Sequence, residues 1–220
     1  MNSLVYVCEL ENIDYDESCF SYLYNLMPLI KKNHVLRITN KKQKLQHLFV
    51  YGLLEHVCNK NNINYSSKNI KYTKYGKPYF FSSNYFFNLS HCEDGIICGL
   101  SSGKIGVDVE KIVEDIEDIV YFTMSKQEKI EIENCNQPNI LFTRYWVLKE
   151  SYLKYIGVGL TDYINKLDFS AFNNIDEFSA YGCKFKVIKK NNIYIACCSK
   201  RDIKFIQVEV DDFVNMGSEK

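Results

Sequence analysis

Apolar and polar positions in the first sixty residues follow the spacing of one strand and two helices. Residues 4–10 (LVYVCEL) combine β-branched and aromatic side chains, which is typical of a strand. Helical spacing follows over about 16–31 and about 40–60. In the second helix, five apolar side chains recur at steps of three and four residues and form one face: Leu45, Leu48, Phe49, Leu53 and Val57.

The rest of the chain repeats this order of elements. Helical spacing returns over about 125–133 and 137–157. Strand-like segments are predicted at about 69–73, 85–89, 95–100, 103–110, 183–189, 193–198 and 203–210. Runs of strands separate from runs of helices predict an α+β fold. We expect two similar α+β halves, residues 1–105 and 106–220, with a site where they meet.

The composition narrows the classes of protein to consider. With 27 basic and 27 acidic side chains the formal charge is zero, which argues against a general nucleic-acid-binding protein. The nine cysteines include no Cys-x-x-Cys pair, and most lie in apolar runs, as reduced thiols do. The first residues hold too short an apolar run for a signal peptide, and no stretch is long enough to span a membrane. We therefore expect a globular, cytoplasmic protein.

Two acidic residues stand on the predicted strand GVDVE. Asp108 and Glu110 are two positions apart, so their side chains point to the same face of a strand, while Val107 and Val109 point to the other. Adjacent carboxylates raise each other's pKa unless a cation lies between them. Mg²⁺ commonly takes one or two carboxylates together with substrate phosphates. The alternative is a strand edge at the surface with two solvated acids.

The segment WVLKESYLKYIGVGL (146–160) predicts a helix with a polar ridge. Trp146, Glu150 and Lys154 are spaced four residues apart and lie along that ridge. A solvated Glu150–Lys154 pair, the alternative to a functional one, would contribute only about 0.3–0.5 kcal/mol. The tryptophan on the same ridge favours a partly buried face. Gly157 and Gly159 predict the end of the helix.

Two further segments hold residues that suit phosphate binding. In FNLSHCEDG (87–95), Ser90 and His91 are neighbours and point to opposite faces of a strand, so His91 is badly placed to activate the serine. His91 is either a structural histidine or a group that holds a phosphate. In YGKP, Lys77 and Pro78 form part of a turn, which is either a plain loop or a rigid support that presents the lysine to a phosphate.

In this order, YGKP, FNLSH, GVDVE and WVLKESYLKYIGVGL resemble the signature series of the Sfp-type 4'-phosphopantetheinyl transferases. The most diagnostic parts are the acidic strand and the W-x-x-K-E-S-x-x-K helix that follows it. The resemblance covers almost the whole chain and implies two α+β halves in a pseudo-two-fold arrangement. It also implies an enzyme that transfers the phosphopantetheine arm of coenzyme A to a serine of an acyl or peptidyl carrier protein, releasing 3',5'-ADP.

The resemblance further implies roles for individual residues. Asp108, Glu110 and Glu150 would be the Mg²⁺ ligands, and Glu150 would remove the serine proton, directly or through a water. Lys154 would clamp the phosphates of coenzyme A. Contacts to coenzyme A are also implied for residues of the N-terminal half: Lys31, Lys41, Lys77, Pro78, Ser90 and His91.

Two other functions remain open on the sequence. One is a catalytically silent regulator that binds coenzyme A or a nucleotide, which the complete set of three carboxylates disfavours. The other is a hydrolase that uses Cys92 or Ser90, with a base brought in from His34, His47 or His56. We expect a monomer that acts on coenzyme A and an apo-carrier protein and that binds neither nucleic acid nor a membrane.

The segment after the acidic strand, residues 111–126, is expected to form part of the carrier dock. It begins beside the metal carboxylates, where the serine must arrive, and it mixes apolar with acidic residues. Ile112 and Val113 are the first expected contacts, and Lys111 and Lys126 would meet an acidic carrier helix. The alternative is that all of its apolar side chains pack inward.

Overall fold

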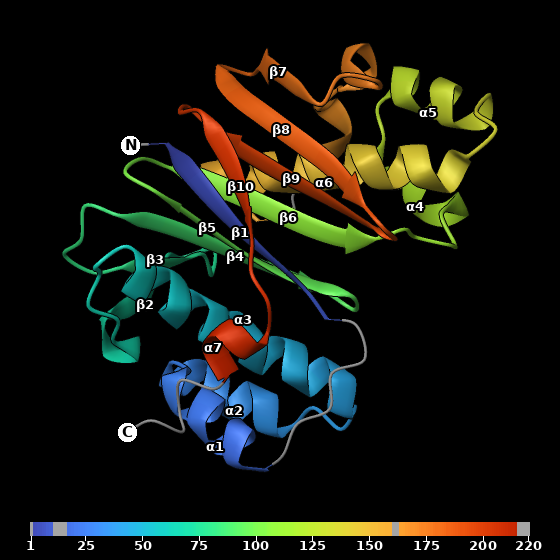
Figure 1. Ribbon diagram of the computed structural model, residues 1–220. Helices are drawn as coiled ribbons and strands as arrows, with labels where there is room; N and C mark the ends of the chain where they lie inside the picture. Colours follow the sequence, from blue (N-terminus) through green and yellow to red (C-terminus); the bar gives the residue numbers. More distant parts are fainter. Residues whose placement is uncertain (1, 11–16, 160–162, 215–220) are drawn as a thin grey trace.

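The computed structural model describes residues 2–10, 17–159 and 163–214, and it shows two four-stranded sheets, each with its own helices (Figure 1). The first half contains β1 (Ser3–Glu9), α1 (Glu17–Leu26), α2 (Leu29–Leu36), α3 (Lys41–Lys60), β2 (Ile70–Tyr72), β3 (Pro78–Phe80), β4 (Phe86–Cys92) and β5 (Gly95–Ser101). The second half contains β6 (Ile105–Lys111), α4 (Glu117–Thr123), α5 (Lys126–Glu133), α6 (Pro138–Ile156), β7 (Glu177–Ala180), β8 (Cys183–Lys190), β9 (Ile193–Ser199), β10 (Ile203–Gln207) and α7 (Asp211–Val214). The predicted α+β class is confirmed.

The end of the chain returns to the first half. The strand order is β10-β1-β5-β4 in one sheet and β6-β9-β8-β7 in the other. Strand β10 pairs parallel with β1, whereas β1 with β5 and β5 with β4 are antiparallel. Helix α7 follows, and its buried Phe213 packs edge-on against Phe49 of α3, with ring centres 6.1 Å apart. The division of the chain into functional halves at 105/106 remains a prediction.

Three apolar cores hold these layers together. Helices α1 and α3 pack on the outer face of the first sheet, and α6 packs on the outer face of the second. The two inner faces share a third core, to which β1, β5, β6 and β9 all contribute. Val107 and Val109 of β6 lie in this shared core, while Asp108 is buried on the other side of the same strand. The predicted alternation along GVDVE is therefore confirmed.

Helix α6 lies directly on β6 because Gly106 has no side chain. A Cβ atom added at Gly106 would lie 2.0 Å from the Ser151 carbonyl oxygen and 2.3 Å from the Tyr155 amide nitrogen, both in the helix backbone. Atoms cannot approach this closely, so any larger residue would push α6 away. This close contact brings the polar ridge of α6 over the acidic residues of β6.

Local sequence signals explain which helix predictions are confirmed and which one is wrong. Helix α3 begins after Asn40, whose side chain accepts a hydrogen bond from the Gln43 amide, and α6 ends at Gly157 in the left-handed region. The single helix predicted over 16–31 is wrong, because α1 ends at Leu26 and α2 begins after Pro28; position 16 lies outside the described residues. Strands β3 and β7 and helices α4 and α7 were not predicted. None of the described helices is both long and apolar enough to cross a bilayer.

A candidate active site where the two sheets meet

The edge strands of the two sheets, β4 and β6, are joined by side chains of β4. The Oδ1 atom of buried Asn88 accepts a hydrogen bond from the Val107 amide at 2.8 Å. Two residues further along, Ser90 Oγ donates to Asp108 Oδ1 at 2.9 Å. These contacts fix the register between the halves and place a serine hydroxyl against the first carboxylate of GVDVE.

Lys154 of α6 completes a three-way contact at this position. Its Nζ atom lies 2.6 Å from Asp108 Oδ1 and donates to Ser90 Oγ at 2.8 Å. Asp108 is only 1% exposed, so the ammonium group compensates a carboxylate that is removed from water. Residues that the sequence placed on three separate motifs therefore meet at one point.

This arrangement also bears on the hydrolase alternative. The Ser90 hydroxyl donates to a carboxylate and accepts from an ammonium group, so it is a positioned hydroxyl rather than half of a serine–histidine pair. Burial raises the pKa of the Cys92 thiol to about 12, which keeps it protonated and weakly nucleophilic. Neither candidate nucleophile has the environment that hydrolysis requires.

Two acidic residues extend the site from the Asp108–Lys154 contact. Burial, and then the charge of Asp108, raises the pKa of both Glu110 and Glu150 to about 7. Glu110 Oε1 accepts a hydrogen bond from Trp146 Nε1 at 3.4 Å. The site therefore concentrates carboxyl groups that burial and mutual repulsion hold in part in their protonated form near neutral pH.

The carboxylates have unmet capacity for a positive ligand. Asp108 Oδ2 and Glu150 Oε1 are both buried and have no hydrogen-bond partner. Such orphaned oxygen atoms are unusual inside a protein and call for an explanation. In the described part of the chain no three His, Cys, Asp or Glu side chains are already gathered as a metal site. The oxygen chemistry and the two orphaned atoms nevertheless fit a hard divalent cation bound to Asp108, Glu110 and Glu150.

Histidine rings line the N-terminal side of the site. The ring of His91, on β4, meets that of His47, on α3, with centres 4.5 Å apart, and His47 meets His34, on α2, at 5.4 Å. Burial lowers the pKa of His91 to about 4, and the charges of Lys154 and Lys31 act in the same direction. His91 is therefore neutral near pH 7, in a region of positive potential that suits an anion.

Three further residues were predicted to contact coenzyme A, and the structure places them before β3, in β3 and in α3: Lys77, Pro78 and Lys41. Lys77 donates to the carbonyl oxygens of Ile105, at 3.0 Å, and of Lys154, so its amine caps the end of α6. Burial lowers the pKa of the Lys77 amine to about 8. Pro78 is the first residue of β3, and exposed Lys41 is the first residue of α3, about 9 Å along the helix axis from His47.

Three residues of the site region were not identified from the sequence. His47 was placed in the N-terminal helical region with no signal that brings it to β4, and only the fold makes that contact. Asn88 could have been found, because a polar amide inside the apolar run YFFNL needs a partner. Lys149 stands inside the W-x-x-K-E-S motif, and nothing in the motif indicates which residue it pairs with.

Comparisons with known proteins agree with this geometry. Residues 104–205 match the family model of the 4'-phosphopantetheinyl transferase superfamily. This range holds the three carboxylates and Lys154. The 4'-phosphopantetheinyl transferase gsp of Aneurinibacillus migulanus is 29% identical over 154 residues, which are 68% of this chain and 64% of that protein.

Two proteins of Bacillus subtilis give shorter matches. A 4'-phosphopantetheinyl transferase is 33% identical over 91 residues, 40% of this chain and 41% of that protein. The 4'-phosphopantetheinyl transferase Sfp is 27% identical over 110 residues, 49% of this chain and 47% of that protein. The matched part of the chain thus spans less than two thirds of the length of each of these relatives. The resemblance to the Sfp-type 4'-phosphopantetheinyl transferases is thereby confirmed, and residues 104–205 carry the match to their superfamily.

Proposed function

We propose that this protein transfers the 4'-phosphopantetheine arm of coenzyme A to a serine of an acyl or peptidyl carrier protein. The observation that carries the proposal is the meeting of Ser90, Asp108 and Lys154 beside the carboxyl groups of Glu110 and Glu150, with all but Ser90 in the segment that matches the transferase superfamily. The serine oxygen bonds to the phosphorus that carries the pantetheine arm. The bond from that phosphorus to the bridging oxygen breaks, and 3',5'-ADP leaves.

Asp108, Glu110 and Glu150 would hold the magnesium ion. Their buried oxygen atoms are hard donors, and two of these atoms have no other partner. Bound Mg²⁺ would supply positive charge to the pyrophosphate as its bridging bond breaks. In its absence Lys154 provides the compensating charge on Asp108, so we expect this lysine to turn toward the substrate phosphates when the ion binds.

Glu150 is the residue proposed to take the serine proton. Without a cation its pKa is about 7, and the charge of bound Mg²⁺ would favour the ionised form that accepts a proton. Burial is the main cause of that pKa, since the side chain is enclosed between α6 and β6. The proton leaves the serine hydroxyl for Glu150, directly or through a water, as the new bond to phosphorus forms.

The N-terminal half is proposed to bind the nucleotide side of coenzyme A. The proposed contacts for its phosphates are neutral His91, the hydroxyl of Ser90 and the amines of Lys31 and Lys154. Lys41 would contribute from the start of α3. Lys77 and Pro78 would act less directly, because the Lys77 amine binds carbonyl oxygens at the end of α6.

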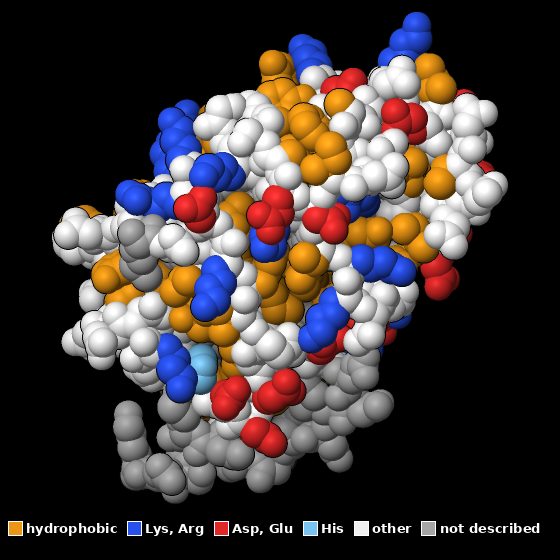
Figure 2. Space-filling view, turned by 45° about the horizontal axis from the view of Figure 1, so that its top comes forward, with side chains coloured by type: hydrophobic (Ala, Val, Ile, Leu, Met, Phe, Trp, Pro, Cys, Tyr) orange, Lys and Arg blue, Asp and Glu red, His pale blue; other side chains and the backbone are white. Residues whose placement is uncertain are grey.

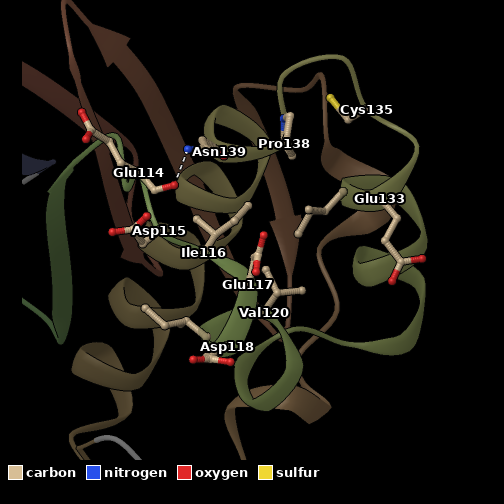
Figure 3. Close-up of a pocket in the computed structure, with 12 residues that line it drawn as sticks. Glu114, Asp115, Ile116, Glu117, Asp118, Val120, Glu133, Cys135, Pro138 and Asn139 are labelled. Carbon is tan, nitrogen blue, oxygen red and sulfur yellow. Dashed lines mark hydrogen bonds between the residues drawn. The ribbon is translucent and has the colours of Figure 1, made fainter.

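A groove between α4, α5 and the start of α6 is proposed as the carrier dock. It encloses about 780 Å³, and Ile116, Val120 and Ile132 give it an apolar lining (Figure 3). Asn139 of α6 lies at one end of it, about 16 Å along the helix axis from Glu150. A carrier helix that begins with its serine at the site would reach this groove after about eleven residues. The groove thus lies at the right distance for the carrier.

The contacts within residues 111–126 differ from the first expectation. Ile112 and Val113 are partly buried and pack against the core of the second half, so the exposed apolar contacts lie further along the chain. Lys111 is paired with Glu93, at 3.0 Å, and with Asp94, at 3.3 Å. Lys111 is therefore already neutralised, and the groove itself determines the charge that a carrier meets.

The side chains that line the groove give it a negative charge. Five carboxylate residues line the groove, with four on one side and Glu133 on the other (Figure 3): Glu114, Asp115, Glu117, Asp118 and Glu133. A carrier helix that runs into the groove also brings its negative C-terminal end toward these acids. We therefore propose that the accepted carrier has cationic side chains about three turns after its serine, because like charges would oppose docking.

The cysteines and the distribution of surface charge support a proposal for the location and partners of the protein. All nine cysteines are free thiols, which supports the cytoplasm as the location. Basic and acidic side chains are interspersed over the face in Figure 2, with apolar patches between them, rather than collected into one basic surface. We propose a monomer that works without nucleic acid or membrane. The alternative, a silent coenzyme A-binding regulator, is disfavoured by the complete carboxylate set.

The test is the mass of a carrier protein after incubation with this protein, coenzyme A and Mg²⁺. A panel of apo-carriers that differ in helix charge should include one that gains the mass of one phosphopantetheine arm on its serine. Omission of Mg²⁺, with a chelator present, should abolish the gain. Tight binding of coenzyme A without modification of any carrier would favour the regulator.

A further inference from the structure

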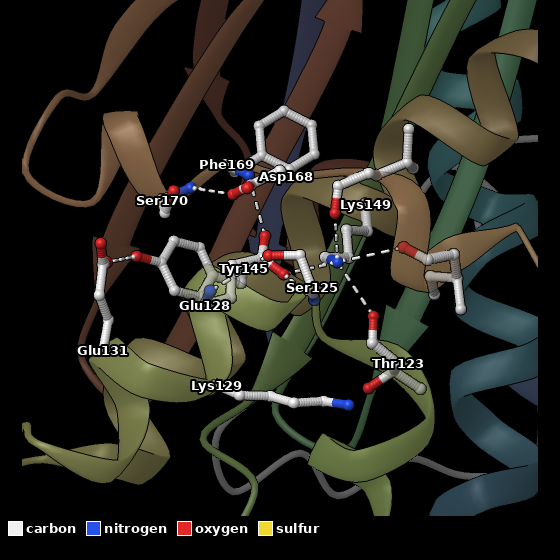
Figure 4. A network of polar contacts seen from close by, with 12 residues as sticks. Thr123, Ser125, Glu128, Lys129, Glu131, Tyr145, Lys149, Asp168, Phe169 and Ser170 are labelled. Carbon is white, nitrogen blue, oxygen red and sulfur yellow. Dashed lines mark hydrogen bonds and ion pairs between the residues drawn. The ribbon is translucent and has the colours of Figure 1, made fainter.

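A second lysine–carboxylate pair lies on the same helix as the candidate site and is wholly enclosed in the second half. Lys149 of α6 and Glu128 of α5 both have fully buried side chains, and Lys149 Nζ lies 2.6 Å from Glu128 Oε2. Figure 4 shows the lysine amine in the middle of a polar network, with oxygen atoms on several sides. A charged pair at such depth needs a complete set of partners to be tolerated.

The lysine amine joins four segments of the chain. Besides Glu128, it donates to the carbonyl oxygens of Thr123 at 2.9 Å, Ile164 at 3.1 Å and Leu167 at 2.7 Å. Thr123 is the last residue of α4, the helix that lines the acidic groove, and 164–167 is the segment that returns toward β7. One side chain of α6 thus holds both neighbours of the helix in place.

The carboxylate of Glu128 is equally saturated. Its Oε2 atom accepts from the Ser125 amide at 2.8 Å, which closes a capping box at the start of α5. Its Oε1 atom accepts from the Phe169 amide at 2.9 Å. Burial raises the pKa of Glu128 and lowers that of Lys149, and in each case the charge of the partner opposes the shift. The network is complete without any ligand.

The position of the pair on α6 links it to the site. Lys149 immediately precedes Glu150, and neighbouring residues point about 100° apart around a helix. The contacts of Lys149 with Glu128 and the backbone carbonyls therefore hold one side of α6, while the ridge of Glu150 and Lys154 faces β6. A rotation of α6 by about 10° would move a group about 6 Å from its axis by about 1 Å. A displacement of that size can cost about 100-fold in rate.

We propose that the Lys149–Glu128 pair is a positioning device that sets the rotation of α6 and thereby aims Glu150 and Lys154 at the reacting groups. This inference rests on the proposed transfer function. Lys149 is a positioning residue and touches no substrate. Its amine connects α4, which lines the proposed carrier groove, to α6, which carries Glu150 and Lys154. The groove and the catalytic side chains are thereby held in a fixed position relative to each other.

The experiment compares Lys149→Met with Arg144→Met, a matched variant on the same helix. Arg144 is also buried, pairs with Asp176 at 2.9 Å and donates to the Phe172 and Ile175 carbonyl oxygens, so it too ties α6 to a loop. Both variants should lower the melting temperature, by about 10 °C in Lys149→Met, which leaves Glu128 buried without its cation, and by less in Arg144→Met, because Asp176 is 69% exposed. At a temperature where both are folded, kcat should fall about 100-fold in Lys149→Met and stay within about threefold in Arg144→Met.

A second readout does not depend on activity. Trp146 is the single tryptophan of the chain, and its Nε1 atom donates to Glu110 of β6, so its emission reports the rotation of α6 against that strand. The emission maximum should shift in folded Lys149→Met and remain unchanged in Arg144→Met. Glu128→Gln, which keeps the shape of the side chain, serves if Lys149→Met does not fold. Equal kcat and equal emission in the two helix variants would overturn the proposal. A wild-type protein that transfers nothing would refute the proposed function, and the emission shift would still decide the role of the pair.

Discussion

Two lysines of α6, five residues apart, each lie 2.6 Å from a buried carboxylate, yet their surroundings differ in every other respect. Both oxygens of Glu128 have a partner, the amine of Lys149 has four, and both side chains are completely buried. At the other pair, Lys154 is 29% exposed, Asp108 Oδ2 has no partner, and neighbouring Glu150 has an orphaned oxygen as well. The polar groups around Lys149 and Glu128 all have partners within the protein, whereas the carboxylates around Lys154 can still bind a ligand.

The difference shows how one helix serves stability and function at once. A saturated buried network fixes a structure, because the removal of any member leaves a charge without compensation. An unsaturated set of carboxylates costs stability in the free protein and is retained where a cation and phosphates complete it. Substitutions in one region at a time test whether the two pairs differ in this way.

The largest effect is expected at Asp108. Asp108→Ala removes the proposed metal ligand that also contacts Ser90 and Lys154, and no neighbour can replace it. Transfer should fall by about 10²–10³-fold, because the charge on the pyrophosphate is then less well compensated. Circular dichroism should show a folded protein. Near-normal turnover of the folded variant at limiting Mg²⁺ would remove Asp108 from the site.

Lys154→Ala should lower kcat as much as Lys149→Met does, but with a smaller loss of stability. Lys154 is 29% exposed, so water can replace part of its charge on buried Asp108; the melting temperature should fall less than in Lys149→Met, while kcat falls about 100-fold. Lys154→Arg should not restore full activity, because a planar guanidinium does not reproduce a compact ammonium. Wild-type kinetics in Lys154→Ala would return this residue to an ordinary surface pair.

Glu150→Gln should stabilise the protein above pH 7. The pKa of this carboxyl is about 7 when folded against 4.5 ordinarily, so its stabilising contribution is complete below pH 4.5 and is lost as the pH rises through 7. The uncharged amide avoids that loss. In a chelator, the free energy of unfolding at pH 8 should be about 2 kcal/mol higher in Glu150→Gln than in wild type. The difference should vanish near pH 4.5, and a pH-independent difference would contradict the shifted pKa.

The smallest effect concerns the acidic groove. Glu117→Lys should raise the KM for a carrier with cationic residues after its serine by about threefold to tenfold, and lower it for an acidic carrier. The KM for coenzyme A should not change. Asp211→Lys, at an exposed position of α7, which packs against α3, makes the same charge change as a control. Equal effects of the two variants would mean that net charge, and not the groove, selects the carrier.

The sequence predicted most of the elements, and the faces on which the candidate site residues lie, because those features are local. The period of two along GVDVE placed Asp108 and Glu110 on one face, and the spacing of four placed Trp146, Glu150 and Lys154 on one ridge. Gly157 marked the end of α6, and the ranges expected from about 40 and about 125 agree with the caps at Asn40 and Ser125 in the structure. Each of these signals needs only a few neighbouring residues to be read.

The remaining features depend on contacts between distant segments. The return of β10 to β1, the meeting of His47 with His91, and the carbonyl cage around Lys149 join residues far apart in the chain. Lys149 and Lys154 look alike in the sequence, since both are lysines of the same helical motif and lie within four residues of Glu150. Only the fold shows that one amine is enclosed by backbone carbonyls and the other faces a buried carboxylate next to a serine.

The most direct measurement is the intact mass of an apo-carrier after incubation with coenzyme A, Mg²⁺ and either wild type or Glu150→Gln at pH 8. Circular dichroism in the same buffer should show that both proteins are folded. We predict that wild type adds one phosphopantetheine arm to the carrier serine and that Glu150→Gln adds almost none in the same time. Equal modification by both proteins, or none by wild type with any carrier of the panel, would contradict a transfer site at the meeting of the two sheets.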